Sequence, residues 1–377
     1  MTNVIELAQK LVQYRSHSPQ LFPVFSYLKT YLEADGFNVR LFDLENDNHA
    51  KTPGLFASMG QGGKHLLFAG HLDIAAPQAE EEWRYSPFGG TVDDGLLYAR
   101  GICDMKGAVA GFISACESLT KEGGLPGRVS LLLSGDEEEC GGHSVQKMLE
   151  QLTAEGEKFD FCIFGSPSNP KRLGEAIKIG ARGSLWFEIK SFGRSGHPAY
   201  HAASQNPLHN LLDLLNKLKA TALDNGNENF SPSTLQIMSL RSENGLYSNF
   251  PMTATAMVQI LYNNNHRPEN IVSWMQRNVS FAKGEFELKY EKDRNIYYNT
   301  PEREMSLLKE VIERASGIIP SCGTEGSSTS AGFISSYCPV IEFGLTNALV
   351  HRMNEAAKVE DIYLLEVIYR DFIKNYF

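Results

Sequence analysis

The chain has 377 residues, of which 42% are hydrophobic and 21% charged, and its formal net charge is −10 at neutral pH. This is the composition of an ordinary soluble protein long enough for two domains. The acidic balance argues against nucleic acid as a partner, because there is no excess of basic side chains to neutralise phosphates. No apolar run approaches the roughly 18 residues of a membrane-spanning helix, so no membrane partner is expected.

The N-terminal residues predict a first helix rather than a signal peptide, because Glu6 lies within an amphipathic pattern of Val4, Leu7 and Leu11. The cysteines are scattered without paired spacing, at Cys103, Cys116, Cys140, Cys162, Cys322 and Cys338. Reduced thiols in a cytoplasmic protein fit this distribution best. Cys103 lies beside an acidic residue of interest, but we interpret it as a packing residue rather than a nucleophile.

The first half of the chain alternates between helices and strands, which is typical of an α/β domain. Helices are expected at 3–14, 22–35, 108–119 and 143–152, and strands at 37–42, 54–59, 66–70, 128–134 and 159–164. A hairpin is expected at 91–99, around the turn sequence Asp93-Asp94-Gly95. The C-terminal part again alternates between helices and strands. A helix is expected at 302–315, a short strand at 340–343 and a final helix at 359–376.

The middle of the chain follows a different order. Strands are expected at 185–193, 234–242, 253–262 and 286–291, and helices at 204–223 and 268–281. The resulting order, βαββαβ, is a split βαβ unit. We therefore predict a discontinuous domain of residues 1–182 and 295–377, interrupted by an inserted domain of residues 183–294.

The predicted strand 66–70 is apolar throughout and is followed by His71 and Asp73. Residues two apart on a strand point to the same side. Open α/β sheets usually present their sites at the carboxyl edge of such strands. By itself the pair is weak evidence for a site, because a histidine hydrogen-bonded to a loop is the more common situation.

Further acids and a histidine lie at comparable loop positions. Asp104 precedes the helix expected at 108–119, where a helix cap is the simpler interpretation of a single Asp. Residues 136–139 are successive acids after the buried strand 128–134 and would repel one another without a cation, unless they form a solvated turn. His351 ends the loop at 347–351.

Imidazole and carboxylate ligands together suit zinc or a similar divalent ion. Two such ions can share a bridging carboxylate and a bridging water. Adjacent side chains cannot both face a metal equally, so of Glu137 and Glu138 one is expected to bind metal. The other is then available as the general base.

These motifs resemble the dizinc aminoacylase and carboxypeptidase superfamily. They are His-x-Asp at 71–73, Arg-Gly-x-x-Asp-Met-Lys-Gly at 100–107, Gly-Asp-Glu-Glu at 135–138 and the late His351. Within it the chain most resembles the succinyl-diaminopimelate desuccinylases of lysine and cell-wall biosynthesis, through residues 180–185, 195–200 and 347–355. The resemblance implies a zinc-peptidase-like catalytic domain with a mostly parallel mixed sheet. It also implies a ferredoxin-like insert that serves as a dimerisation and lid domain, so that the protein is a homodimer.

The resemblance also implies roles for individual residues. His71 would bind the first metal, Asp104 would bridge both metals, and Glu138 and His351 would hold the second. Glu137 would be the general base, Asp73 would orient His71, and His197 would stabilise the oxyanion across a dimer interface. The residues expected to contact the N-acyl amino acid substrate are Arg182, Asn249, Thr329, Ser330 and Asn347. The implied cofactor is one or two zinc ions, with cobalt as a substitute. Apart from the resemblance, His197 is equally well interpreted as a surface histidine.

The chain departs from that family at several positions. Ser166 stands where the family has a Glu ligand of the first metal, so this site is expected to be weak, empty or completed by water. Ala181-Arg182 replaces paired arginines, and the strand end at 259–262 lacks a further arginine. The predicted reaction is hydrolysis of N-succinyl-LL-2,6-diaminopimelate to succinate and LL-2,6-diaminopimelate. The alternatives are another N-acyl amino acid or a dipeptide as substrate, or a catalytically impaired relative that binds metal or ligand.

Overall fold

The computed structural model of the chain describes residues 3–45, 51–199, 205–243 and 249–377, without the side chains of residues 139, 140, 243 and 293. The end of the 195–200 motif, the start of the helix expected from 204 and the Cys140 side chain lie outside this part. The chain forms two compact units, which are residues 1–180 with 298–377, and residues 181–297. In the described part, no helix combines the length and apolar character that crossing a membrane requires.

Unit 1 is built on a mixed sheet whose central strands β6, β3, β7 and β16 are parallel. Its strand order is β1 (Asn38–Glu45), β2 (Lys51–Met59), β6 (Arg128–Ser134), β3 (His65–His71), β7 (Phe161–Phe164), β16 (Val340–Glu342), β8 (Ala176–Lys178) and β15 (Ser321–Gly323). Every residue of β3 is buried. Because β3 is covered on both faces, its side chains on both sides are apolar and its hydrophobicity does not alternate.

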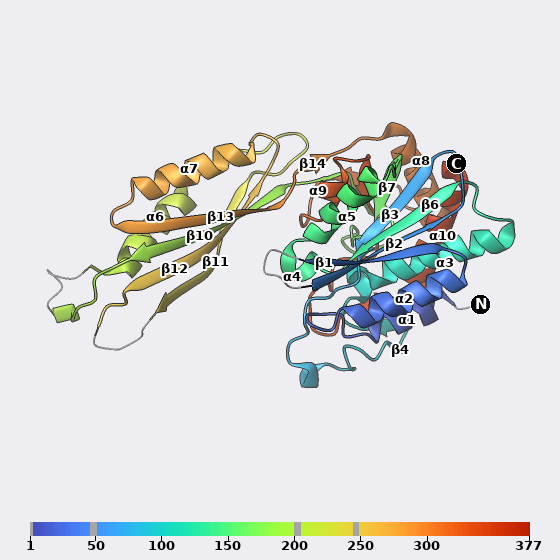
Figure 1. Ribbon diagram of the computed structural model, residues 1–377, viewed down its shortest axis with the longest axis horizontal. Helices are drawn as coiled ribbons and strands as arrows, with labels where there is room; N and C mark the ends of the chain where they lie inside the picture. Colours follow the sequence, from blue (N-terminus) through green and yellow to red (C-terminus); the bar gives the residue numbers. More distant parts are fainter. Residues whose placement is uncertain (1–2, 46–50, 200–204, 244–248) are drawn as a thin grey trace. The chain divides into compact units, whose positions relative to one another are not determined.

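Helices cover both faces of this sheet (Figure 1). They are α1 (Val4–Val12), α2 (Phe22–Ala34), α3 (Gly107–Glu122), α4 (Glu137–Cys140), α5 (His143–Ala154), α8 (Glu302–Ser316), α9 (Ala331–Ile334) and α10 (Val359–Tyr376). On one face, Phe68 of β3 stacks on Phe112 of α3 and meets Tyr369 of α10 edge-on. On the other, Met148 of α5 lies directly over Gly54 of β2. This packing fixes where the carboxyl ends of the parallel strands emerge.

Smaller elements complete the unit. β4 (Thr91–Asp93), β5 (Leu96–Tyr98) and β17 (Ala356–Lys358) form a small sheet, and β9 (Gly180–Ala181) pairs with β14 (Tyr297–Tyr298). Single helical turns span Glu80–Glu82 and Ile102–Lys106. The acidic run after β6 is not a strand extension or a plain turn but the helical turn α4, which ends where Gly141 and Gly142 adopt positive φ.

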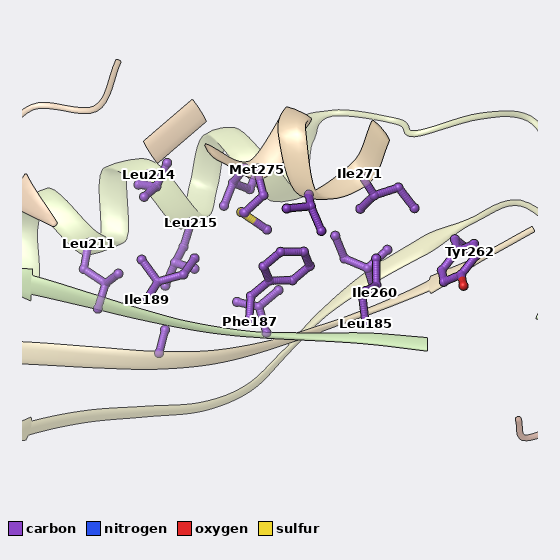
Figure 2. Close-up of a cluster of buried hydrophobic side chains, with 14 of the residues drawn as sticks. Leu185, Phe187, Ile189, Leu211, Leu214, Leu215, Ile260, Tyr262, Ile271 and Met275 are labelled. Atoms are coloured by element: carbon purple, nitrogen blue, oxygen red, sulfur yellow. The ribbon is translucent and has the colours of Figure 1, made fainter. Parts of the chain in front are cut away.

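Unit 2 has the predicted βαββαβ order. Its elements are β10 (Gly183–Phe192), α6 (Pro207–Ala220), β11 (Thr234–Glu243), β12 (Thr253–Tyr262), α7 (Pro268–Ser280) and β13 (Glu285–Arg294), and its antiparallel sheet has the order β11-β12-β10-β13. Alternate residues of β12 are buried, so one sheet face carries the core. Figure 2 shows Leu185, Phe187 and Ile189 of β10 pointing toward the leucines of α6 and Met275 of α7. The predicted fold class is confirmed.

Asp224 ties two loops of unit 2 together. Its carboxylate accepts hydrogen bonds from the Gly226 amide at 2.6 Å and from Asn263 Nδ2 at 2.7 Å, and it pairs with His266 Nε2 at 3.0 Å. Burial alone would raise the pKa of Asp224, but hydrogen bonds from Ser233, Gly226 and Asn263 outweigh it and lower the pKa to about 2. The ionised carboxylate is therefore the form that stabilises the fold.

We expect Asp224→Ala to lower the free energy of unfolding by about 1–2 kcal/mol near neutral pH. The loss is modest for a charged hydrogen-bond network, because solvent partly screens the Asp224 carboxylate. Folding lowers the pKa of Asp224 from 3.8 to about 2. The stabilisation by the ionised carboxylate is therefore complete above pH 3.8 and is lost as the pH falls toward about 2. Urea unfolding of both proteins at several pH values measures it. An unchanged stability at neutral pH would contradict this role.

Candidate metal centre

His71 is the last residue of β3 and is 2% exposed. Its Nδ1 lies 3.0 Å from the Asp73 carbonyl oxygen and 3.4 Å from Asp73 Oδ1. These contacts turn the other ring nitrogen, Nε2, toward Asp104, whose Oδ1 is 3.2 Å away. The ring orientation is thus set by the residue two positions along the chain, as is usual for histidines that bind metal.

Asp104 reaches this position because its loop lies against the sheet. Within the turn Ile102–Lys106, Asp104 and Met105 leave helical geometry. A Cβ on Gly70 of β3 would come within 2.3 Å of Met105 Cε, and one on Gly165 after β7 within 2.7 Å of the same atom. The absence of a side chain at these two positions leaves room for the end of the Met105 side chain, which packs there and brings the loop close to the end of β3.

Glu138 and His351 join the same cluster from two other segments. The Glu138 amide donates a 2.8 Å hydrogen bond to Asp73 Oδ2, which attaches α4 to the loop after β3. His351 Nε2 lies 2.8 Å from Glu138 Oε1 and 3.8 Å from Asp104 Oδ2. His71, Asp104 and Glu138 each offer a ligand atom within 4.8 Å of the others.

The protonation chemistry of the cluster calls for a cation. Burial opposes a charge on His71, but hydrogen bonds to Asp104 and Asp73 outweigh it and hold its pKa well above the ordinary value. The hydrogen bond to Glu138 likewise raises the pKa of His351. When His71 is neutral and donates from Nδ1, its Nε2 lone pair faces a carboxylate. A divalent metal relieves this repulsion, and mixed nitrogen and oxygen donors suit zinc, so these residues fit the implied metal.

Glu137 is held rigidly beside this cluster. Its Oε1 accepts a 3.0 Å hydrogen bond from the Ser330 amide at the start of α9, and its Oε2 accepts one from Ser330 Oγ. Gly142, with φ of +64°, leaves the necessary space, because a Cβ there would lie 1.9 Å from Ser330 Oγ and 2.5 Å from Glu137 Oε2. A carboxylate fixed through both oxygens next to metal-binding side chains is well placed to act as a base.

Most of the other predicted site residues have hydrogen-bond partners of their own. Thr329 Oγ1 donates to Glu342 at 3.0 Å, Ser166 Oγ donates to the same carboxylate, and the exposed Asn347 donates to the Pro167 carbonyl at 3.3 Å. Three residues belong to unit 2: Arg182 donates to the Pro232 carbonyl at 3.0 Å, and His197 and Asn249 are exposed. Unit 1 therefore brings together His71, Asp73, Asp104, Glu138 and His351 around one point.

Several buried charged residues near the site escaped the sequence interpretation. They are Arg100, Lys178, Glu342 and Glu355. Glu342 had a usable signal, because an acid inside the otherwise apolar segment 340–343 is unusual in a buried strand. Arg100 and Glu355 lie inside motifs already quoted, but nothing in those motifs shows that the two side chains meet.

Comparison with known proteins places the chain in context. Residues 67–375 match the model of peptidase family M20/M25/M40. A protein of Gluconacetobacter diazotrophicus named succinyl-diaminopimelate desuccinylase is 38% identical over 376 residues, which cover 99% of this chain and 97% of that protein.

Two solved structures share the fold. One is an M20 family metallo-carboxypeptidase from Sulfolobus solfataricus, with a TM-score of 0.86, 19% identity, and coverage of 100% and 99% of the two chains. The other is a dinuclear metal binding M20 peptidase from Bacillus subtilis, with a TM-score of 0.70, 14% identity, and coverage of 99% and 97%. The match to the family model over most of the chain, with the metal-binding geometry described above, shows that the chain belongs to peptidase family M20/M25/M40.

Proposed function

We propose that the chain is a metal-dependent amide hydrolase that cleaves N-succinyl-LL-2,6-diaminopimelate into succinate and LL-2,6-diaminopimelate, in the cytoplasm. The name of the 38% identical relative supports this substrate. The observation that carries the chemistry is the convergence of His71, Asp104, Glu138 and His351 beside a clamped Glu137. We propose zinc as the metal, with cobalt as a substitute.

The proposed reaction uses the chain's own groups in sequence. A bound divalent ion supplies Lewis acidity, which polarises the amide carbonyl and acidifies water. The Glu137 carboxylate takes a proton from the attacking water, whose oxygen bonds to the carbonyl carbon. Glu137 then delivers that proton to the leaving nitrogen as the C–N bond breaks, which gives a carboxylic acid and an amine. Transfer of the acid's proton to the amine leaves a carboxylate and an ammonium ion. Ser330 keeps both Glu137 oxygens oriented through the two steps.

A second candidate keeps the reaction and changes the substrate. Ala181 is a small apolar residue beside Arg182, and Gln259-Ile260-Leu261-Tyr262 ends β12 without a cation. Arginine is the usual partner of a substrate carboxylate, because it binds both oxygens at once. Fewer arginines favour an N-acyl amino acid or dipeptide with fewer carboxylates than the succinylated compound.

A buried ion pair supports the proposed ligands Asp104 and His351. Glu355 is wholly buried and accepts from Arg100 Nη1 at 2.9 Å and from the Cys103 amide at 3.0 Å. Arg100 Nη2 also donates to the His351 carbonyl at 3.4 Å. One carboxylate–guanidinium pair thus fixes the backbone next to both ligands, and such surrounding contacts tune metal affinity.

We also propose a homodimer formed through unit 2. β11 is an edge strand of its sheet, and Ile237, Met238 and Leu240 on it are between 40% and 53% exposed. An apolar edge strand is a ready template for pairing with a second copy. In that dimer, His197 is proposed to assist the oxyanion in the partner's site, and Arg182 and Asn249 to contact substrate.

We expect a chelator to abolish hydrolysis of N-succinyl-LL-2,6-diaminopimelate and zinc or cobalt to restore it. Glu137→Gln should lower kcat by about 10²–10⁴-fold, because the base is lost while the metal ligands stay. The exposed Glu360→Gln on α10 is the matched control. Release of the free amine is the measurement.

The same assay over other N-acyl amino acids and dipeptides separates the candidates. Higher kcat/KM on one of those compounds would favour the second candidate. Absence of turnover on the whole panel with bound zinc would identify an impaired relative and contradict both.

We expect Glu355→Gln to weaken zinc binding by about 10–100-fold, as replacements around metal ligands commonly do. The isosteric amide cannot accept from both Arg100 and Cys103 without presenting its own N–H₂ group to one of them. Competition with a chromophoric chelator measures the affinity. The control is Arg370→Met, which removes an exposed ion pair with Glu122. Unchanged affinity in a folded Glu355→Gln protein would refute the positioning role.

For the dimer, we expect light scattering to give twice the mass of the chain for the wild type and the single mass for Leu240→Lys. Leu349→Lys, at an exposed leucine of unit 1, should remain dimeric. A monomeric wild type would argue against the proposed assembly and against a role for His197 in the partner's site.

A further inference from the structure

Ser166 lies beside His71 at the edge of the sheet. β7 pairs in parallel with β3, with Phe164 opposite Ala69. Continuing this register by two residues brings Ser166 next to His71, and the Gly165 amide donates to the Ala69 carbonyl at 3.0 Å. The side chain at position 166 therefore borders the metal-binding cluster, and a carboxylate there would be a natural additional ligand.

The side chain at this position instead belongs to a closed network. Ser166 Oγ donates to Oε2 of Glu342, which is wholly buried at the end of β16. The other oxygen, Oε1, accepts from Thr329 Oγ1 at 3.0 Å and pairs with Lys178 Nζ at 3.1 Å. Lys178 also donates to the Ser327 carbonyl.

This network leaves nothing for a metal ion. Both Glu342 oxygens are engaged, and the Lys178 ammonium already balances the carboxylate charge. A neutral serine hydroxyl is not among the usual zinc ligands, which are thiolate, imidazole and carboxylate. A cation here would also lie near the Lys178 ammonium, whose positive charge acts on Asp104.

Three of the remaining residues can reach a single ion, because His71, Asp104 and Glu138 each offer a ligand atom within 4.8 Å of the others. His71 Nε2 to Asp104 Oδ1 is 3.2 Å, Glu138 Oε1 to His351 Nε2 is 2.8 Å, and Asp104 Oδ2 to His351 Nε2 is 3.8 Å. Ligands of tetrahedral zinc bonded at 2.0–2.1 Å lie about 3.3 Å apart. The His71–Asp104 distance is close to that value, whereas His351 faces the second Asp104 oxygen and lies next to Glu138.

We infer that this chain holds one divalent ion, bound by His71, Asp104 and Glu138, with His351 next to Glu138. The hydrogen-bonded network of Ser166, Glu342, Lys178 and Thr329 takes the place of a second ion. This rests on the proposed function in assuming a divalent metal, and it differs from the dinuclear peptidase of Bacillus subtilis.

The test is metal content rather than activity. The full chain is freed of metal with a chelator, incubated with excess zinc and desalted. Its zinc content is then measured by inductively coupled plasma mass spectrometry. We expect one zinc per chain for the wild type and two for Ser166→Glu. Ser168→Glu, which adds a carboxylate two residues away, should keep one. Two zinc ions in the wild type, or one in folded Ser166→Glu, would overturn the inference.

Glu342→Gln is a second test in case Ser166→Glu does not fold. This change removes the carboxylate charge that Glu342 would need in order to bind a metal ion itself. We expect it to retain one zinc, whereas loss of that zinc would make Glu342 a ligand and overturn the inference. His71→Ala should lose the single zinc on desalting, and retention would show that His71 does not share it. A wild type with no zinc would refute the proposed function as well, whereas two ions would refute only this inference.

Discussion

Repulsion between carboxylates is the constraint on which the rest of the site depends. Asp104 and Glu138 approach the same point from different loops, and each faces an imidazole nitrogen at 3.2 Å or less. In a low-dielectric setting such a cluster is stable only when positive charge lies within it, as protons on the histidines or as a metal ion. The same requirement that makes the cluster costly to fold makes it a strong binding site for a divalent cation.

The scaffold meets this constraint with contacts that are themselves buried. Asp73 orients His71 through its carbonyl group and holds α4 through Oδ2, so one residue aligns two of the four donors. Met105 packs over strand glycines and keeps the Asp104 loop against the sheet. The Arg100–Glu355 pair ties that loop to the segment carrying His351. Each proposed ligand is thus held in place by contacts within the protein.

Charge is balanced differently on the two sides of His71. Toward Asp104 and Glu138 the positive charge comes from protons on the histidines or from a bound cation, whereas toward Ser166 it is supplied by Lys178 against Glu342. The Ser166 hydroxyl and the Lys178 ammonium bind the Glu342 carboxylate and balance its charge, as a metal ion would otherwise do. Membership of a family that includes a dinuclear enzyme therefore does not fix the number of ions in this chain.

The sequence by itself determined the fold class, the order of elements and the segments that carry the proposed metal ligands. Period and length are local properties, so the strand expected at 66–70, the helix 359–376 and the βαββαβ order could be predicted from neighbouring residues. Strands of three residues such as β8 and β15 were missed, because so short a stretch has no readable period. Only the tertiary structure decided that Ser330 clamps Glu137 and that Ser166 and Thr329 meet on Glu342. Those contacts join residues as many as 193 positions apart, and side-chain pairing at that separation depends on how the sheet and helices pack.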